Sequence, residues 1–118
     1  MPRALTRVDA GYPARLAEVP DAPATLHVRG ALVDADALAV AIVGSRRATP
    51  YGLEVAETLA ADLAARGVTI VSGLARGIDS AAHRGALRVG GRTLAVLGSG
   101  VDVIYPPENR RVDRKSVV

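Results

Sequence analysis

Three short, mostly apolar runs, each closed by glycine or by a Ser-Gly pair, set the pattern of this chain. Unbroken runs of four to six residues are too short for isolated helices and are typical of strands that are covered on both faces. The runs are Leu38–Val43 before Gly44, Val68–Val71 before Ser72-Gly73, and Thr93–Leu97 before Gly98. They predict three buried strands. The alternation of apolar and polar residues in Leu26–Gly30 predicts one further, short edge strand.

The stretches between these runs have the spacing of helices. Thr49 and Pro50 are predicted to be the N-cap and first residue of a helix that Gly67 ends. One of the residues Asp79–Ser80 is predicted to cap a second helix, which runs to about Val89. The apolar stripe of the first helix consists of Leu53, Val55, Ala56, Leu59, Ala60 and Leu63.

The repeated order of strand, glycine loop and helix predicts the fold class. The segments between the strands are long enough for parallel pairing, and right-handed crossovers then give an α/β fold. We expect a doubly wound, mostly parallel, Rossmann-like sheet. Residues 1–36, interrupted by Pro13, Pro20 and Pro23, are expected to form an irregular N-terminal lead-in that the short edge strand overlaps.

Composition removes several classes of function. The chain of 118 residues contains no cysteine, which excludes disulfide scaffolds, cysteine-based zinc sites and thiol chemistry. Phenylalanine and tryptophan are also absent, and three tyrosines are the only aromatic residues. This argues against a binder that stacks the bases of a single strand on aromatic side chains.

The positive charge is made almost wholly of arginine. Fourteen of the fifteen cations are arginine, the exception being Lys115. Residues 1–45 carry a net charge of −1, whereas residues 46–118 carry +4 and most of the glycines. Arginine favours bidentate contacts with phosphate, so the excess indicates an anionic partner. The same excess can reflect genomic composition, and the count alone favours neither interpretation.

In such a sheet, ligands lie beyond the carboxyl ends of the strands, where three loops are expected to meet. Glycines there let backbone N–H groups approach a phosphate, and helix N-termini favour an anion. The glycines alone are equally compatible with simple tight turns, but Ser45-Arg46 directly after a strand favours a phosphate-binding cleft. The candidate residues are Gly44, Ser45, Arg46 and Arg47 in the first loop, Ser72, Gly73 and Arg76 in the second, and Gly98, Ser99 and Gly100 in the third.

The sequence motifs do not support nucleotide-binding, metal-binding or catalytic chemistry. The dinucleotide fingerprint G-x-G-x-x-G fails because position 103 is valine, and no P-loop motif occurs. His27 and His83 have no metal-ligand spacing; His83 is interpreted as a surface or packed helix residue without function. We expect no catalytic residues, no metal and no cofactor. The absence of a membrane-spanning apolar run or a signal-peptide core predicts a cytoplasmic protein without a membrane partner.

Three long strings resemble the signatures of the DNA-processing protein A (DprA, or Smf) family. The first comprises Val40–Arg46 followed by Thr49–Gly52, the second is Val71–His83, and the third is Leu97–Asn109. Together with Tyr12-Pro13 and Leu26–Gly30, the resemblance covers about residues 11–111. Three motifs of this length in the same order make the resemblance highly specific.

The resemblance implies a role that the spacing alone does not. Members of this family have an extended Rossmann fold, bind single-stranded DNA, protect incoming strands in natural transformation and load the RecA recombinase. They act as homodimers and are not known for catalysis. Arg46 matches the family arginine that contacts DNA phosphate. The resemblance also implies that the loops at Ser72-Gly73 and Gly98–Gly100 line the same positive pocket.

The resemblance ends near Arg111. Residues 37–111 are interpreted as a partial Rossmann-like DprA domain and residues 112–118 as a non-matching tail, so we expect a truncated chain. The family places its dimer surface and RecA contact largely in its later half, and we do not expect either to be complete here. Two alternatives remain: a Rossmann-type nucleotide phosphoribohydrolase of the lysine-decarboxylase-like group, and a non-functional remnant. The Pro-Gly-Gly-x-Gly-Thr-x-x-Glu signature of that enzyme group is absent.

Overall fold

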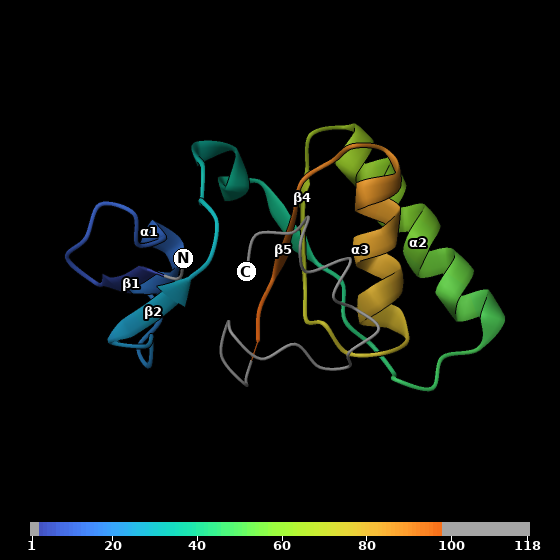
Figure 1. The fold of residues 1–118 in the computed structure, drawn as a ribbon, viewed down its shortest axis with the longest axis horizontal. Coiled ribbons are helices and arrows are strands. Elements are labelled where there is room, and N and C mark those ends of the chain that lie inside the picture. The colour runs from blue at the N-terminus through green and yellow to red at the C-terminus, as the bar shows by residue number, and fades with distance from the viewer. Residues whose placement is uncertain (1–2, 98–118) are drawn as a thin grey trace.

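The structure, a computed structural model, describes residues 3–97. Its elements fall into an N-terminal module and an α/β unit, coloured blue to cyan and green to orange in Figure 1. The N-terminal module contains β1 (Arg3–Thr6), α1 (Ala14–Ala17), β2 (Thr25–Val28) and the 3-10 helix η1 (Asp34–Ala37). The α/β unit contains β3 (Ala39–Ala41), α2 (Pro50–Ala65), β4 (Thr69–Ser72), α3 (Ile78–Arg88) and β5 (Thr93–Ala95).

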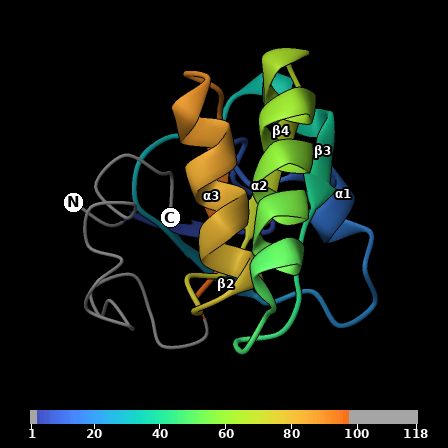
Figure 2. The same cartoon turned by 90° about the vertical axis from the view of Figure 1, so that its right-hand side faces the viewer.

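The α/β unit is built on a parallel sheet with the strand order β3-β4-β5. Val40 pairs with Ile70, and Ile70 pairs with Thr93. Both crossovers step across the sheet in the same direction, so right-handed connections place α2 and α3 on the same face, as Figures 1 and 2 show. The predicted parallel α/β sheet is confirmed. Its described part corresponds to one βαβαβ half of a Rossmann-like fold.

Small residues hold the two helices together. A cluster that includes Ala60 and Ala86 is buried between α2, α3 and Ile70 of β4. A Cβ atom added to Gly85 would lie 2.1 Å from the Glu57 carbonyl oxygen. Glycine at this position therefore permits the backbones of the two helices to approach closely.

Two predictions about apolar side chains are wrong. The first run was expected to be covered on both faces, but β3 is an edge strand of the described sheet and Val43 beyond it is 71% exposed. The reason is that α2 and α3 cover one face only. Val55 and Leu59 were expected in the buried stripe of α2, yet they are 43% and 47% exposed. The alanine face of α2 packs against α3 instead.

The ends of α2 follow the prediction, whereas the start of α3 does not. Thr49 Oγ1 accepts a 3.0 Å hydrogen bond from Gly52 N–H, and Pro50 opens the helix. Gly67, at the predicted end, has a φ of +86°, which suits glycine after a helix. In α3 the N-cap is Gly77 and not one of the residues Asp79–Ser80, because Gly77 has a φ of +80° and the helix begins at once after it.

The N-terminal module has its own small core. Leu5 of β1 and Val28 of β2, an antiparallel pair of strands, form a buried cluster with Tyr12 from the segment before α1. The Tyr12 hydroxyl donates to Pro23 O over 2.7 Å. Strand β2 confirms the predicted short edge strand, whereas β1 was not predicted. Asp36 of η1 links the module to the sheet, because its carboxylate accepts hydrogen bonds from Thr69 and from the Arg92 guanidinium.

Candidate nucleic-acid interface

Two of the three predicted loops lie within the described residues. The first loop (residues 44–49) lies between β3 and α2, and the second loop (residues 72–77) runs from the last residue of β4 to α3. Both leave the carboxyl ends of neighbouring parallel strands and lie at one end of the α/β unit, as Figure 1 shows. The third loop, with the candidates Gly98, Ser99 and Gly100, lies outside the described residues.

The first loop presents its polar side chains to solvent. Ser45, Arg46 and Arg47 are all exposed. Ser45 Oγ accepts a 3.0 Å hydrogen bond from Arg47 N–H, which gives the loop a local turn before Thr49 caps α2. The sequence therefore places two arginines beside the N-terminus of a helix of 16 residues.

The two loops touch each other closely. Ile78 N–H donates to Ser45 O over 3.2 Å. A Cβ atom on Gly44 would lie 2.8 Å from the Ile78 side chain, and one on Gly77 would lie 2.2 Å from Ser45 O. Glycine is required at both positions by the approach of one loop to the other. This structural role is visible, while direct contact of Gly44 with a ligand stays a prediction.

The second loop is held by hydrogen bonds to buried groups of the α/β unit. Ser72, at the end of β4, is 2% exposed, and its hydroxyl donates to Ile42 O at the end of β3. Ser80 Oγ donates to Ala75 O over 2.6 Å. The space beside Gly73 is occupied, because a Cβ atom there would lie 2.7 Å from Asp79 Oδ2. Ser72 and Gly73 therefore shape the loop, and their contact with a ligand stays a prediction.

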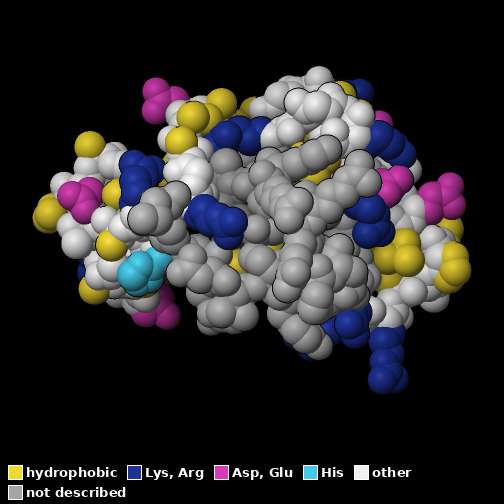
Figure 3. All heavy atoms as spheres, in the orientation of Figure 1, with side chains coloured by type: hydrophobic (Ala, Val, Ile, Leu, Met, Phe, Trp, Pro, Cys, Tyr) yellow, Lys and Arg dark blue, Asp and Glu magenta, His cyan; other side chains and the backbone are white. Residues whose placement is uncertain are grey.

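The charges at this end of the molecule are mainly positive. Arg46, Arg47 and Arg76 are exposed, and the N-termini of α2 and α3 start from the same two loops. Helix N-termini carry partial positive charge, so the loops and the helix ends favour the same kind of ligand. Asp79, half-buried in the first turn of α3, places one carboxylate close to the second loop. In Figure 3, Lys and Arg side chains protrude at the lower right edge, where Figure 1 draws these loops.

His83 adds a residue that the sequence interpretation left without a role. Its side chain is fully buried in α3, with Nε2 2.5 Å from Gly73 O and Nδ1 2.6 Å from Thr93 Oγ1. Burial lowers the pKa of His83, although the Gly73 carbonyl and the Asp79 carboxylate act in the opposite direction. The sequence signal was a histidine directly after Ala81-Ala82, on the helix face that the alanines bury.

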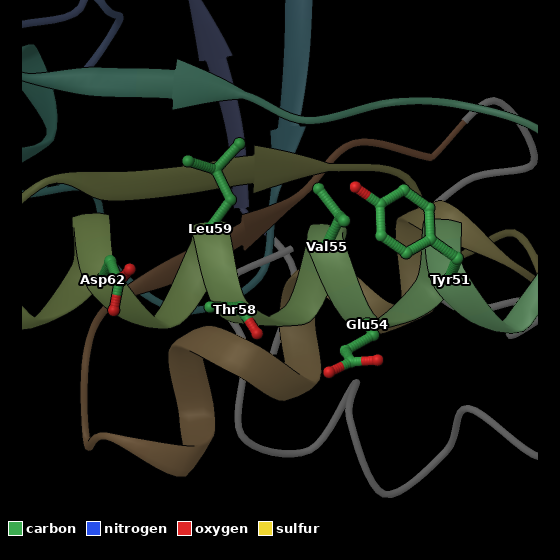
Figure 4. Close-up of a pocket in the computed structure, with 6 residues that line it drawn as sticks. All are labelled: Tyr51, Glu54, Val55, Thr58, Leu59 and Asp62. Atoms are coloured by element: carbon green, nitrogen blue, oxygen red, sulfur yellow. The ribbon is translucent and has the colours of Figure 1, made fainter.

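A groove of about 370 Å³ lies elsewhere, along the outer side of α2. Tyr51, Val55 and Leu59 follow one another along the helix there, as Figure 4 shows. None of the predicted binding residues lines it. Within residues 3–97 no three side chains of the metal-binding types form a cluster. Over the same range, no helix is both long and apolar enough to cross a membrane.

Comparison with known proteins identifies the family. The family model for DNA recombination-mediator protein A matches residues 3–117. The chain belongs to this family. It is 45% identical over 115 residues to protein Smf of Synechocystis, covering 94% of this chain and 29% of that protein. It is also 45% identical to DNA processing protein DprA of Streptococcus pneumoniae, covering 89% of this chain and 37% of that protein.

Two solved structures of family members match the fold. DprA from Streptococcus pneumoniae has a TM-score of 0.84 at 42% identity, covering 95% of this chain and 39% of that one. DNA processing protein A from Helicobacter pylori, in a structure that concerns its single-stranded DNA binding mode, has a TM-score of 0.80 at 31% identity. That match covers 98% of this chain and 54% of the other. The Rossmann-like fold and the suspected DprA membership are thus confirmed, and the chain spans about a third of the curated relatives' length.

Proposed function

We propose that this chain binds single-stranded DNA through the phosphate backbone at the end of the sheet formed by the first and second loops. The observation that carries the proposal is the contact between these loops, which holds Arg46 and Arg47 in an exposed position beside the N-terminus of α2. Family membership and the single-stranded DNA binding of the Helicobacter pylori relative support the same ligand.

The proposed mechanism is electrostatic. Arg46, Arg47 and Arg76 donate hydrogen bonds to phosphate oxygens, since a guanidinium matches the geometry of a phosphate. The N-termini of α2 and α3 add partial positive charge at the same end. Such contacts position a strand without reading its sequence, so binding is expected to be sequence-independent and strongly dependent on salt. In the proposed site, Gly44, Ser72 and Gly73 shape the loops. The family resemblance assigns Gly98, Ser99 and Gly100 of the third loop to the same DNA site.

In the cell, we propose a non-catalytic role in DNA processing and recombination. The bound strand would be protected after entry during natural transformation and passed to the RecA recombinase in the cytoplasm. RecA contact and homodimer formation are part of this proposal for the whole family protein, of which the chain spans about a third. In this role, the first and second loops hold the single-stranded DNA. A remnant without function would not bind DNA in a salt-dependent manner.

The proposal is tested by titrating a fluorescent oligo-dT strand at several salt concentrations. We expect Arg46→Ala to weaken binding about ten-fold, because it removes a charge-assisted contact. The slope of log affinity against log salt should fall by about 0.7, which corresponds to one phosphate of a single strand. Arg66→Ala is the matched control, since Arg66 is an exposed arginine at the opposite end of α2.

Two results would contradict the proposal. If Arg46→Ala and Arg66→Ala bind with the same affinity and slope, the loops are not the binding site. Release of ribose phosphate from AMP by the wild-type protein would favour the phosphoribohydrolase alternative. Heat-denatured protein sets the background of that assay.

A further inference from the structure

His83 is a buried titratable side chain to which the proposed DNA binding gives no role. It lies in the second turn of α3 with 0% of its surface exposed. Both ring nitrogens have partners outside the helix: Gly73 O in the second loop and Thr93 Oγ1 at the start of β5. The side chain therefore connects three elements at once, namely α3, the loop after β4 and the neighbouring strand β5.

The hydrogen-bond partners of His83 define the protonation state and the tautomer of its ring. A carbonyl oxygen only accepts, so the bond to Gly73 requires a hydrogen on Nε2. Burial lowers the pKa of His83, which leaves the ring neutral with a single hydrogen at neutral pH. Nδ1 then accepts from the Thr93 hydroxyl. The Thr93 hydroxyl has a single hydrogen, which it can donate to Nδ1 or to Ile70 O, 3.0 Å away at the β4–β5 pair. With the ring neutral and the ring hydrogen on Nε2, that hydroxyl hydrogen goes to Nδ1.

The bond to Gly73 acts at the point where the chain leaves β4. Ser72 is tied to Ile42 O on one side of this point, and His83 holds the next residue from the opposite side. From there the loop continues to Gly77 and Ile78, which contact Ser45 O. A change in the direction of the chain at Gly73 would therefore be transmitted to Ser45 and so to the residue that follows it, Arg46.

We propose that His83 is a positioning residue for the DNA interface: its bonds to Gly73 and Thr93 fix the course of the second loop and, through Ser45, the place of Arg46. The inference rests on the proposed function. His83 itself is buried and touches no DNA. Its contribution is to hold the loops in the binding geometry before the strand arrives, so that ordering them costs less on binding.

Two substitutions of the same chemical type test this inference. In His83→Gln, the side-chain amide nitrogen reaches the position of Nε2 and can donate to Gly73 O; in His83→Asn, it reaches only the position of Nδ1. We expect His83→Asn to weaken binding of oligo-dT about five-fold, the effect of one lost buried hydrogen bond, and His83→Gln to remain within about two-fold of wild type. The salt slope should be unchanged in both, because no phosphate contact is removed.

If His83→Asn does not fold, a second variant and a spectroscopic measurement test the same inference. Thr93→Val keeps the shape of the side chain but removes the hydroxyl that orients the ring, and should weaken oligo-dT binding about three-fold. Ring ¹⁵N shifts of the wild-type protein should show His83 neutral with the hydrogen on Nε2 at pH 7. The exposed His27 serves as the reference within the same sample.

The outcomes separate the inference from the proposed function. If wild-type protein does not bind oligo-dT, the proposed function is wrong and the inference falls with it. If wild type binds and His83→Asn, or Thr93→Val where that variant must replace it, binds equally well, the inference alone is overturned. Equal weakening by His83→Asn and His83→Gln also overturns it, because the bond to Gly73 would then not be the cause. Rescue by glutamine supports it.

Discussion

The first and second loops leave neighbouring strands at the same end of the sheet, yet they are built differently. The first loop is exposed, and the hydrogen bond that Arg47 N–H donates to Ser45 Oγ is local. The second loop is held by the buried side chains of Ser72 and His83. The difference indicates a division of tasks: the first loop supplies two of the three arginines of the proposed site, whereas the second supplies Arg76 and a fixed support against which the first is placed.

The largest effect is expected where the two loops meet. Gly77→Ala places a Cβ atom 2.2 Å from Ser45 O at a φ of +80°. The clash and the backbone strain together should lower the free energy of unfolding by about 3 kcal/mol. Urea unfolding measures this loss. Gly90→Ala is the control, because Gly90 also has a positive φ but no atom lies within 4 Å of the added Cβ. It should lose only about 1 kcal/mol.

A smaller loss of stability is expected when the serines of the two loops are replaced, and it should differ between the loops. Ser72→Ala leaves Ile42 O without the buried hydroxyl donor that it has now, and should lower the free energy of unfolding by about 1.5 kcal/mol. Ser45→Ala, in the exposed loop, should change it by less than about 0.5 kcal/mol. Thermal or urea unfolding of the two variants side by side checks this. Equal losses would show that the second loop is not held more firmly than the first.

The smallest effect concerns pH. Because the pKa of folded His83 lies below its ordinary value of 6.5, the unfolded chain takes up a proton first as the pH falls. The contribution of neutral His83 to the free energy of unfolding is therefore complete above pH 6.5. It is lost as the pH decreases through the pKa that His83 has in the folded protein. Urea unfolding between pH 7.5 and 5 should show this loss in wild type but not in His83→Gln. The same pH dependence in both proteins would rule out His83 as its source.

Local signals in the sequence were enough for much of the fold. The apolar runs before glycine located β3, β4 and β5, and Thr49 and Gly67 marked the ends of α2 because caps depend on a few adjacent residues. Periodicity could not show that alanines, and not Val55 and Leu59, face α3. That choice depends on Gly85, whose missing side chain allows the helices to approach closely.

The candidate site was predictable in location but not in construction. Loops after parallel strands meet at one end of a sheet, so Arg46, Arg47 and Arg76 could be placed together. The partners that hold the second loop are distant in sequence: Ser72 bonds a carbonyl 30 residues away, and His83 bonds one 10 residues away. Such pairs depend on tertiary packing, which is why the sequence alone does not show that Ser72 and His83 support the second loop.

The salt dependence of oligo-dT binding tests the central claim most directly. Wild type, Arg46→Ala and Arg66→Ala are compared under identical conditions. The proposed interface predicts a steep slope of log affinity against log salt for wild type and Arg66→Ala, and a slope shallower by about 0.7 for Arg46→Ala. Identical slopes for all three proteins would contradict the assignment of the first loop as the place where the DNA backbone binds.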